Sequence, residues 1–364
     1  MQPKSNIVHL PVYKPGKPIE DVKRELGLSE VIKLASNENP FGFSNFAKSA
    51  IQEQLQQINY YPDGASVELT SALATHLLVK PEQLIFGTGS SDIILMIARA
   101  FLTLEDETIM AEETFSQYKH NAEVENAIVV EVPLVDGKHD LVAMQAAITE
   151  RTKIIWICNP NNPTGTIVTN EELVAFLDKV PDHVMVVLDE AYGEYVEDPS
   201  FSNGIQLLDK YHNLVLLRTF SKIYGLASLR IGYGIGDPEI IAYINQVREP
   251  FNTTRLAQVA AKAALADDAF LSYCREQNRA GIDFINQELE RLGLDYFPAH
   301  GNFVMFDAKR ASSEVFQSLL QKGIVARAGW KNYPNWIRIS VGTMPQNEKF
   351  IAALEQVLQE VTVQ

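Results

Sequence analysis

One lysine near the middle of the chain lies in a sequence that can turn an ordinary ammonium group into a nucleophile. Lys222 follows the apolar run 214–217 and belongs to a segment rich in small residues, T-F-S-K-I-Y-G-L-A-S-L-R-I-G-Y. An amine at the end of a buried strand loses solvent, so its pKa falls and its neutral form can attack a carbonyl. Arg230 follows closely and can bind a phosphate through two hydrogen bonds. A lone lysine is usually solvated, but this combination favours a reactive amine.

Other apolar runs also end in polar loops. Asp189 directly follows the run 184–188. A carboxylate in that position is either a helix N-cap or the partner of a buried cation, such as a protonated pyridine nitrogen. The loop N-P-N-N-P-T-G at 159–165 presents asparagine side chains on a rigid turn, and G-T-G-S-S-D at 87–92 opens a helix whose N-terminus favours an anion. Ligands of open α/β sheets bind beyond the carboxyl ends of strands, so these loops are candidates for a binding site. Taken alone, the segments 87–92 and 159–165 are equally well explained as ordinary turns.

The elements that position these loops alternate between short apolar runs and amphipathic stretches. The runs are apolar throughout, which is typical of strands whose two faces are both covered in a parallel sheet. Strands are expected at 84–86, 108–111, 128–132, 154–158, 184–188 and 214–217, and, after the pattern changes near residue 250, at 302–306, 323–326 and 336–341. Helices are expected at 92–101, 115–126, 272–292, 314–321 and 347–359, and after the T-x-x-E capping box formed by Thr169 and Glu172.

This pattern predicts an α/β protein with a large, mainly parallel-sheet α/β/α domain and a smaller α+β domain. We expect an N-terminal arm at 1–30 that packs on the small domain or on a partner subunit. The large, ligand-binding domain is expected at 31–250 and the small C-terminal domain at 251–364.

The composition excludes several classes of function. The chain has 364 residues and a net charge of −15, which disfavours nucleic acid as a partner. No apolar stretch approaches the ~20 residues that span a bilayer, and the proline-containing N-terminus has no apolar signal segment. The seven histidines show no metal-ligand spacing, and two cysteines, Cys158 and Cys274, do not make a disulfide framework. We therefore expect a soluble, cytoplasmic protein without a bound metal.

The motifs together resemble a known family. S-K-x-x-G-L-x-x-x-R-x-G-Y at 221–233, preceded by N-P-T-G at 162–165 and D-E-A-Y at 189–192, is similar to the cofactor-lysine region of fold-type I pyridoxal-phosphate aminotransferases. The resemblance covers nearly the whole chain and is strongest to the histidinol-phosphate aminotransferases. The motifs that carry it are Y-K-P-G-K-P (13–18), S-N-E-N-P-F-G (36–42), Y-P-D-G (61–64), T-F-S-Q-Y (114–118) and I-R-I-S-V-G (337–342).

The resemblance implies a role for each matching residue. Lys222 would hold pyridoxal 5'-phosphate covalently, Asp189 would pair with its ring nitrogen, and Tyr118 would stack on the ring. Asn162 and Tyr192 would bond the ring hydroxylate oxygen. The cofactor phosphate would be held by Ser90, Ser91, Ser221, Arg230 and, from the neighbouring subunit of a homodimer, Tyr61. The acidic end of the substrate would be bound by Arg338, with Arg327, Asn162 and Tyr13 assisting.

Two positions depart from the family pattern without removing a catalytic group. Ser228 stands where many relatives have glycine, and Glu113 stands before Thr114 where proline is common.

The implied reaction is a ping-pong transamination. The amino group of L-histidinol phosphate would pass through the cofactor to 2-oxoglutarate, giving imidazole-acetol phosphate and L-glutamate in histidine biosynthesis. An aromatic amino-acid aminotransferase could use the same pocket, and a decarboxylase of a phosphorylated amino acid could share the cofactor motif. A pyridoxal-phosphate-binding transcription regulator is disfavoured, because it would need an additional basic DNA-binding domain.

Overall fold

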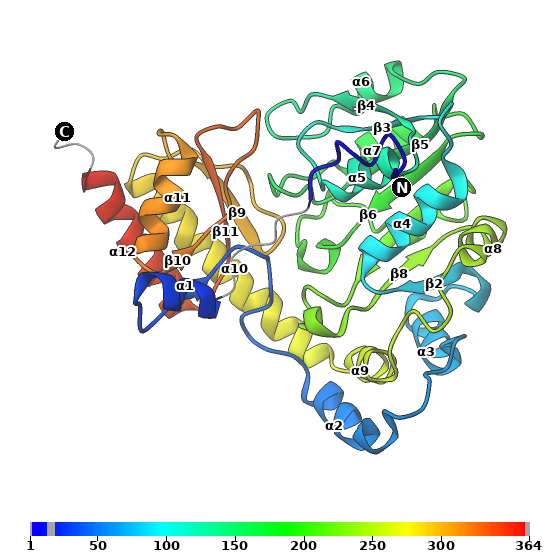
Figure 1. The fold of residues 1–364 in the computed structure, drawn as a ribbon, viewed down its shortest axis with the longest axis horizontal. Helices are drawn as coiled ribbons and strands as arrows, with labels where there is room; N and C mark the ends of the chain where they lie inside the picture. The colour runs from blue at the N-terminus through cyan, green and yellow to red at the C-terminus, as the bar shows by residue number, and fades with distance from the viewer. Residues whose placement is uncertain (1, 13–18, 361–364) are drawn as a thin grey trace.

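A seven-stranded sheet forms the centre of the large domain, which lies on the right in Figure 1. The computed structural model describes residues 2–12 and 19–360. The strand order is β2-β8-β7-β6-β5-β3-β4, and β8 runs in the opposite direction to the other strands of this sheet. The strands are β2 (Leu84–Gly87), β3 (Glu107–Ala111), β4 (Ile128–Val132), β5 (Thr152–Cys158), β6 (Met185–Asp189), β7 (Leu214–Thr219) and β8 (Gly232–Ile235). The predicted mainly parallel α/β sheet is confirmed.

Both faces of this sheet are buried along its central strands, which explains why β6 and β7 are largely apolar, whereas the edge strand β4 is mostly exposed or half-buried. Along β5, Ile154 and Trp156 pack into the core on one face, whereas Ile155 and Ile157 pack into the core on the other. Fully burying one such aliphatic side chain contributes roughly 1.5–3 kcal/mol. The surrounding helices are α2 (Asn45–Gln54), α3 (Val67–Leu77), α4 (Ser90–Phe101), α5 (Gln117–Val124), α6 (Leu141–Ala146), α7 (Asn170–Leu177), α8 (Pro238–Gln246) and α9 (Arg255–Ala264). The predicted capping box is present at the start of α7.

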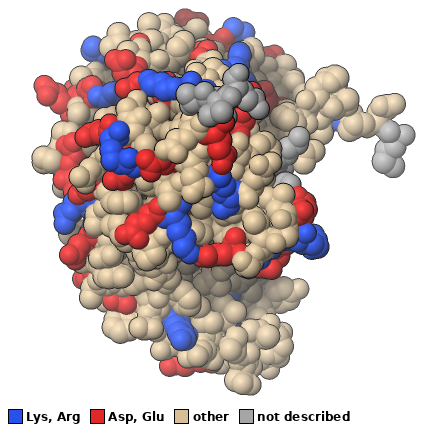
Figure 2. Space-filling view, turned by 90° about the vertical axis from the view of Figure 1, so that its left-hand side faces the viewer, with Lys and Arg blue, Asp and Glu red and all other residues tan. Residues whose placement is uncertain are grey.

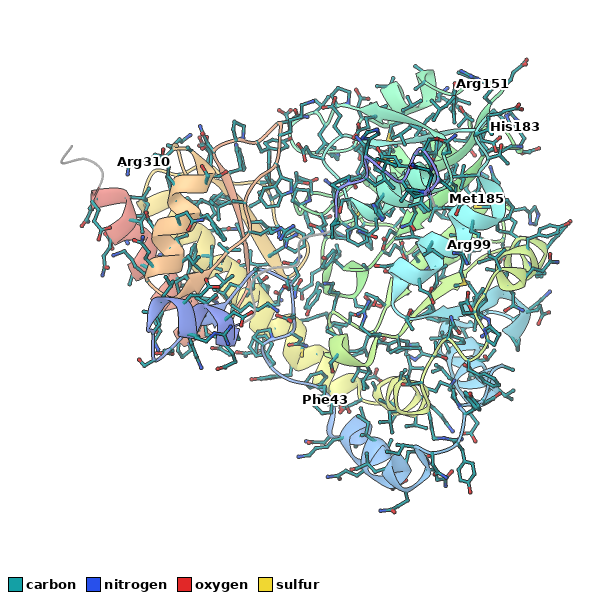
Figure 3. All side chains as sticks on the ribbon, viewed as in Figure 1. Phe43, Arg99, Arg151, His183, Met185 and Arg310 are labelled. Atoms are coloured by element: carbon teal, nitrogen blue, oxygen red, sulfur yellow. The ribbon has the colours of Figure 1, made fainter. Side chains whose placement is uncertain are left out.

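The small domain, on the left in Figure 1, is an α+β unit with its own core. Strand β9 (Phe303–Asp307) pairs antiparallel with β11 (Trp336–Ser340), and β1 (Ile32–Lys33) pairs parallel with β10 (Ile324–Val325). Helices α10 (Asp268–Arg291), α11 (Ser312–Gln321) and α12 (Met344–Glu360) cover these strands. At its outer side, Arg310, labelled in Figure 3, donates a hydrogen bond to the Leu358 carbonyl near the end of α12.

The structure corrects the predicted domain boundaries. Ile32 and Leu34 belong to the core of the small domain, because β1 pairs with β10. The other border falls inside α10, where Cys274 packs into the large-domain core and Ile285 into the small-domain core. The sequence hides this border because a continuous amphipathic helix crosses it without a breaker.

The N-terminal arm divides between the domains. Helix α1 (Ile19–Leu26) packs Val22 into a cluster with Leu320 and Val325 of the small domain. Farther upstream, Asn6 donates to the carbonyls of Glu123 and Val124 at the end of α5 in the large domain. Across residues 2–12 and 19–360, no helix combines the length and apolarity needed to cross a lipid bilayer.

Candidate active site

A cavity of about 720 Å³ lies at the carboxyl ends of β5, β6 and β7. The last residues of these strands, Cys158, Asp189 and Thr219, line it, and small-domain residues Arg327 and Arg338 complete it from the other side. The polar loops that follow separate strands therefore do converge on one site. The sheet register brings them together, since Cys158 pairs with Asp189 and Asp189 with Leu217.

Lys222 reaches this cavity from the turn between β7 and β8. Its Nζ donates to the Ser36 carbonyl at 3.3 Å and lies 5.3 Å from the centre of the Tyr192 ring. Burial, helped by the positive charge of Arg338, lowers the pKa of Lys222 to about 8. The turn is tight: the Gly225 N–H bonds the Lys222 carbonyl, and a Cβ at Gly225 would lie 1.9 Å from the Gly42 oxygen. The site thus holds an amine that is readily neutral, as a nucleophile requires.

Asp189 is a buried carboxylate at the end of β6. One oxygen accepts from the Tyr118 hydroxyl at 2.7 Å, and the other accepts from the Ala191 N–H at 3.1 Å. Burial raises the pKa of Asp189 to about 6. A cationic ring nitrogen in the cavity would favour the charged form of this carboxylate, so Asp189 fits a protonated pyridine.

The structure contradicts the stacking role predicted for Tyr118. Its ring is fully buried, stacks on Trp156 at 5.0 Å, and is not part of the cavity wall. Phe115, in the same T-F-S-Q-Y motif, lines the cavity and meets the edge of Tyr118. Tyr118 therefore acts through Asp189, and Phe115 is the aromatic side chain placed to face a ring. The motif contains two aromatic residues, and periodicity alone did not separate them.

Four of the five residues predicted to hold the cofactor phosphate lie together at the N-terminus of α4. They are Ser90, Ser91, Ser221 and Arg230, which all line the cavity. Arg230 donates to the Ser221 hydroxyl at 3.3 Å and to the Thr88 carbonyl at 3.2 Å. Gly89 has φ +82°, and a Cβ there would lie 2.5 Å from the Arg230 guanidinium. A helix N-terminus beside a guanidinium group fits a phosphate.

The predicted anion-binding residues of the substrate side come from the small domain. Arg338 is buried, donates to the Ala35 carbonyl at 2.7 Å and bonds the Asn162 side-chain oxygen. Asn162, expected on the ring oxygen of the cofactor, therefore also orients Arg338. Arg327 pairs with Arg338 through backbone hydrogen bonds, and both side chains line the cavity. Tyr13 lies outside the described residues.

Tyr192 is held by a residue to which the sequence assigned no role. Its hydroxyl accepts from the Asn37 side chain at 3.0 Å, and both residues line the cavity. Burial raises the pKa of Tyr192 to about 12. Asn37 belongs to the S-N-E-N-P-F-G motif, so a signal was present, but only the tertiary structure shows its partner.

Tyr61 does not line the cavity of its own chain. It is 78% exposed and stacks on Phe251 with a centre-to-centre distance of 4.8 Å. A role in its own site is therefore excluded by position, while a role in a neighbouring subunit stays a prediction.

A contact between the domains spans the cavity edge. The Asn332 backbone N–H donates to a Glu113 side-chain oxygen at 2.9 Å, and its side chain bonds the Glu112 carboxylate. Burial raises the pKa of Glu113, and the Asn332 N–H partly opposes that rise. Glu113 thus has a structural partner at the position where proline is common. Within the described part of the chain, no group of three or more His, Cys, Asp or Glu side chains is arranged to hold a metal ion.

Comparison with known proteins identifies the class. The family described as aminotransferase class I and II matches residues 29–354, so the chain belongs to the class I and II aminotransferases. It is an enzyme of the fold-type I group, and its cofactor is pyridoxal 5'-phosphate. The Sinorhizobium meliloti histidinol-phosphate aminotransferase, solved in complex with pyridoxal-5'-phosphate, superposes with a TM-score of 0.91 at 27% identity, covering 98% of each chain. The lysine, carboxylate and phosphate cradle described above fit that cofactor.

Within this class, curated relatives that match nearly the whole chain point to one group, the histidinol-phosphate aminotransferases. The enzyme of that name from Brevibacillus brevis is 55% identical over 359 residues, covering 98% of this chain and 99% of the relative. The one from Bacillus subtilis strain 168 is 51% identical over 360 residues, covering 98% of this chain and all of the relative. A Thermus thermophilus aspartate aminotransferase double mutant shares the fold at 26% identity, with a TM-score of 0.84 and coverage of 99% and 100%.

Proposed function

We propose that this enzyme transfers the amino group of L-histidinol phosphate to 2-oxoglutarate, giving imidazole-acetol phosphate and L-glutamate in histidine biosynthesis. The observation that carries the proposal is the pair of guanidinium groups, Arg338 and Arg327, on the small-domain wall of the cavity. A phosphate ester carries more negative charge than a carboxylate, and two guanidinium groups suit it. The names of the curated relatives support the same substrate.

The two substrates present different anions to the same wall. Histidinol phosphate has a phosphate and no carboxylate, whereas 2-oxoglutarate has carboxylates alone. Guanidinium forks bind both, because each anion offers paired oxygens in a plane. Arg338 is fixed by Asn162 and the Ala35 carbonyl, so it stays oriented in both half-reactions.

We propose that the protein itself binds and orients the cofactor and the substrate and moves protons between them. When bound, the cofactor supplies an electron sink for the carbon that carries the amine. Lys222 would take the proton from that carbon on its neutral Nζ, hold it there and then give it back. Asp189 would keep the ring nitrogen protonated, Tyr192 and Asn162 would bond the ring oxygen, and Phe115 would cover a ring face. Ser90, Ser91, Ser221 and Arg230 would hold the cofactor phosphate, and Tyr13 would assist in binding the substrate.

We also propose a homodimer with shared sites. Large apolar side chains are exposed around α2, including Phe46, Ile58, Tyr60 and Tyr61. Phe43, labelled in Figure 3 beside α9, adds to them. Figure 2 shows charged side chains of both signs mixed over most of the visible face, and few of them at its lower end, where α2 lies. An apolar surface of this kind is typical of an interface between subunits.

Subunit mixing tests the shared site directly. Lys222→Ala and Tyr61→Ala subunits are combined by denaturing and refolding, or by co-expression. If Tyr61 serves the neighbouring subunit, each mixed dimer contains one intact site and activity rises above that of the unmixed variants. If Tyr61 acts in its own chain, both sites of the mixed dimer are defective and no rise occurs.

Rapid mixing tests the substrate. The purified enzyme is mixed with L-histidinol phosphate, L-phenylalanine or L-glutamate, and the absorbance of the bound cofactor is followed. Conversion should be fast with histidinol phosphate and slow with phenylalanine. The reverse order would make the enzyme an aromatic amino-acid aminotransferase. Release of carbon dioxide from a phosphorylated amino acid, offered in a separate mixing, would make it a decarboxylase.

We propose a cytoplasmic location together with this activity. The proposed substrates are charged metabolites, which do not cross a bilayer unaided. Fractionation of cells that carry the enzyme, with the activity measured in each fraction, tests the location.

A further inference from the structure

Asn37 has a hydrogen-bond partner for each of its polar groups, and its side chain contacts the Tyr192 hydroxyl. Its backbone N–H donates to the Ser340 hydroxyl at 2.8 Å, and its side-chain oxygen accepts from the same hydroxyl at 2.9 Å. Its backbone carbonyl accepts from Asn302 at 3.0 Å. Its side-chain NH₂ group donates to the Tyr192 oxygen at 3.0 Å. The residue is buried, so these bonds hold one orientation of the amide.

The Ser340 hydroxyl determines which way the Asn37 amide faces. This hydroxyl already accepts from the Asn37 N–H, so its own hydrogen needs an acceptor, and the Asn37 side-chain oxygen provides one. Turning the amide over would place its NH₂ group against Ser340 and leave the serine hydrogen facing a donor. The NH₂ group therefore faces Tyr192, and the Tyr192 oxygen accepts. A hydroxyl that accepts from Asn37 keeps its own hydrogen for another partner.

The backbone of Asn37 is adapted to this position. Its φ is +55°, in the left-handed region that asparagine tolerates better than most residues. Its partner Ser340 lies on β11, two positions after Arg338. The pair thus joins the strand that carries the substrate-binding arginine to the tyrosine on the cofactor side.

We propose that Asn37 is a positioning residue that directs the Tyr192 hydroxyl hydrogen into the cavity, toward the ring oxygen of the cofactor. The inference rests on the proposed role of Tyr192. The charged groups that face the pair are Lys222, Asp189 and Arg338, and the Cys158 thiol is a further titratable neighbour. A hydrogen bond donated to the ring oxygen stabilises its negative charge most when the nearby Lys222 nitrogen has lost its proton. The bond should therefore lower the pH at which that nitrogen titrates.

The test is a pH titration of the absorbance of the bound cofactor, which reports the protonation of the Lys222 nitrogen without turnover. Tyr192→Phe should raise the midpoint by about one pH unit, since one unit corresponds to the loss of one hydrogen bond to a charged oxygen. Asn37→Gly, which accepts the left-handed backbone, should raise it by roughly half as much. In a Tyr192→Phe background, Asn37→Gly should add nothing.

Matched variants distinguish a loss of Tyr192 hydroxyl orientation from a general loosening of the structure around Asn37. Ser340→Ala frees the Asn37 amide to turn and should give a smaller rise than Asn37→Gly. Asn302→Ala removes the bonds to the Asn37 and Glu38 carbonyls but leaves the contacts of the Asn37 amide intact, so it should leave the midpoint unchanged. An equal rise from Asn37→Gly with and without the Tyr192 hydroxyl would overturn the proposal, as would an Asn302→Ala shift as large as that of Asn37→Gly. No shift with Tyr192→Phe would overturn both the proposed role of Tyr192 and this inference. The proposed transfer from histidinol phosphate would be tested independently, by rapid mixing.

Discussion

The two walls of the active site are built in different ways. On the large-domain side, Asp189 is the last residue of β6 and Lys222 lies in the turn that follows β7, so the sheet itself positions them. On the small-domain side, Arg338 is oriented by side-chain and carbonyl contacts to Asn162 and Ala35, which are far away in sequence. A sheet-built wall is rigid, whereas a wall held across a domain border depends on how the domains meet. The first wall is therefore suited to the chemistry, and the second to binding and release.

This contrast predicts that changes in the large-domain wall act on kcat and changes in the small-domain wall act on KM. Lys222→Ala should give the largest effect, lowering transamination at least about a thousand-fold, because it removes both the covalent attachment and the proton carrier. Turnover by stopped-flow or coupled assay measures it. Lys210→Ala, on the exposed surface beside Asp178, is the matched control. Substantial turnover by the Lys222 variant without added amine would refute the assignment.

Asp189→Asn should come next, lowering kcat about a hundred-fold or more while much of the cofactor remains bound. The neutral amide keeps the shape of the carboxylate but no longer holds the ring nitrogen protonated. Cofactor content from absorbance and kcat are measured on the same preparation. Equal losses of both would mean that Asp189 mainly anchors the cofactor.

Arg338→Lys should raise KM for histidinol phosphate by roughly ten- to a hundred-fold and change kcat less. Lysine keeps the charge but loses the planar fork, and one charged hydrogen bond contributes about 1.5–3 kcal/mol. Arg327→Lys tests the neighbouring guanidinium and should give a smaller change. A larger fall in kcat than rise in KM for Arg338→Lys would contradict the division between the two walls.

Cofactor loading should depend on pH through the large-domain wall. Burial lowers the pKa of Lys222 to about 8, and only the neutral amine attacks a carbonyl. The rate at which the apoenzyme takes up pyridoxal phosphate should therefore increase as the pH rises, with a midpoint near 8, and then level off. A midpoint near the ordinary lysine value would mean that the amine is solvated before the cofactor binds.

The smallest effect is expected at the contact between the domains. Asn332→Ala removes the side-chain bond to Glu112 but leaves the backbone bond to Glu113. We expect KM to rise about two- to fivefold, since a partly exposed charged hydrogen bond contributes about 1 kcal/mol or less. Glu112→Gln in the Asn332→Ala background should add little. A strong fall in kcat would show that the contact shapes the chemistry as well as the binding.

The sequence by itself determined the class of fold, the central strands and the chemistry of the strand-end loops. Strands buried on both faces leave continuous apolar runs, and the polar residues after them must meet at one edge of the sheet. Phe115 and Tyr118, in contrast, lie so close in one motif that only packing shows which ring faces the cavity. The domain border inside α10 was hidden because a helix continues through it unbroken.

Only the tertiary structure decided the contacts that join residues far apart in the chain. β8 returns antiparallel against β7 after the Lys222 turn, although its short, glycine-containing sequence does not show a strand. Asn37 meets Ser340 and Tyr192 across 303 and 155 residues of sequence. Periodicity reports which face of an element is buried, but a hydrogen bond between distant elements leaves no periodic trace. Its partners are therefore determined only when the two domains pack together.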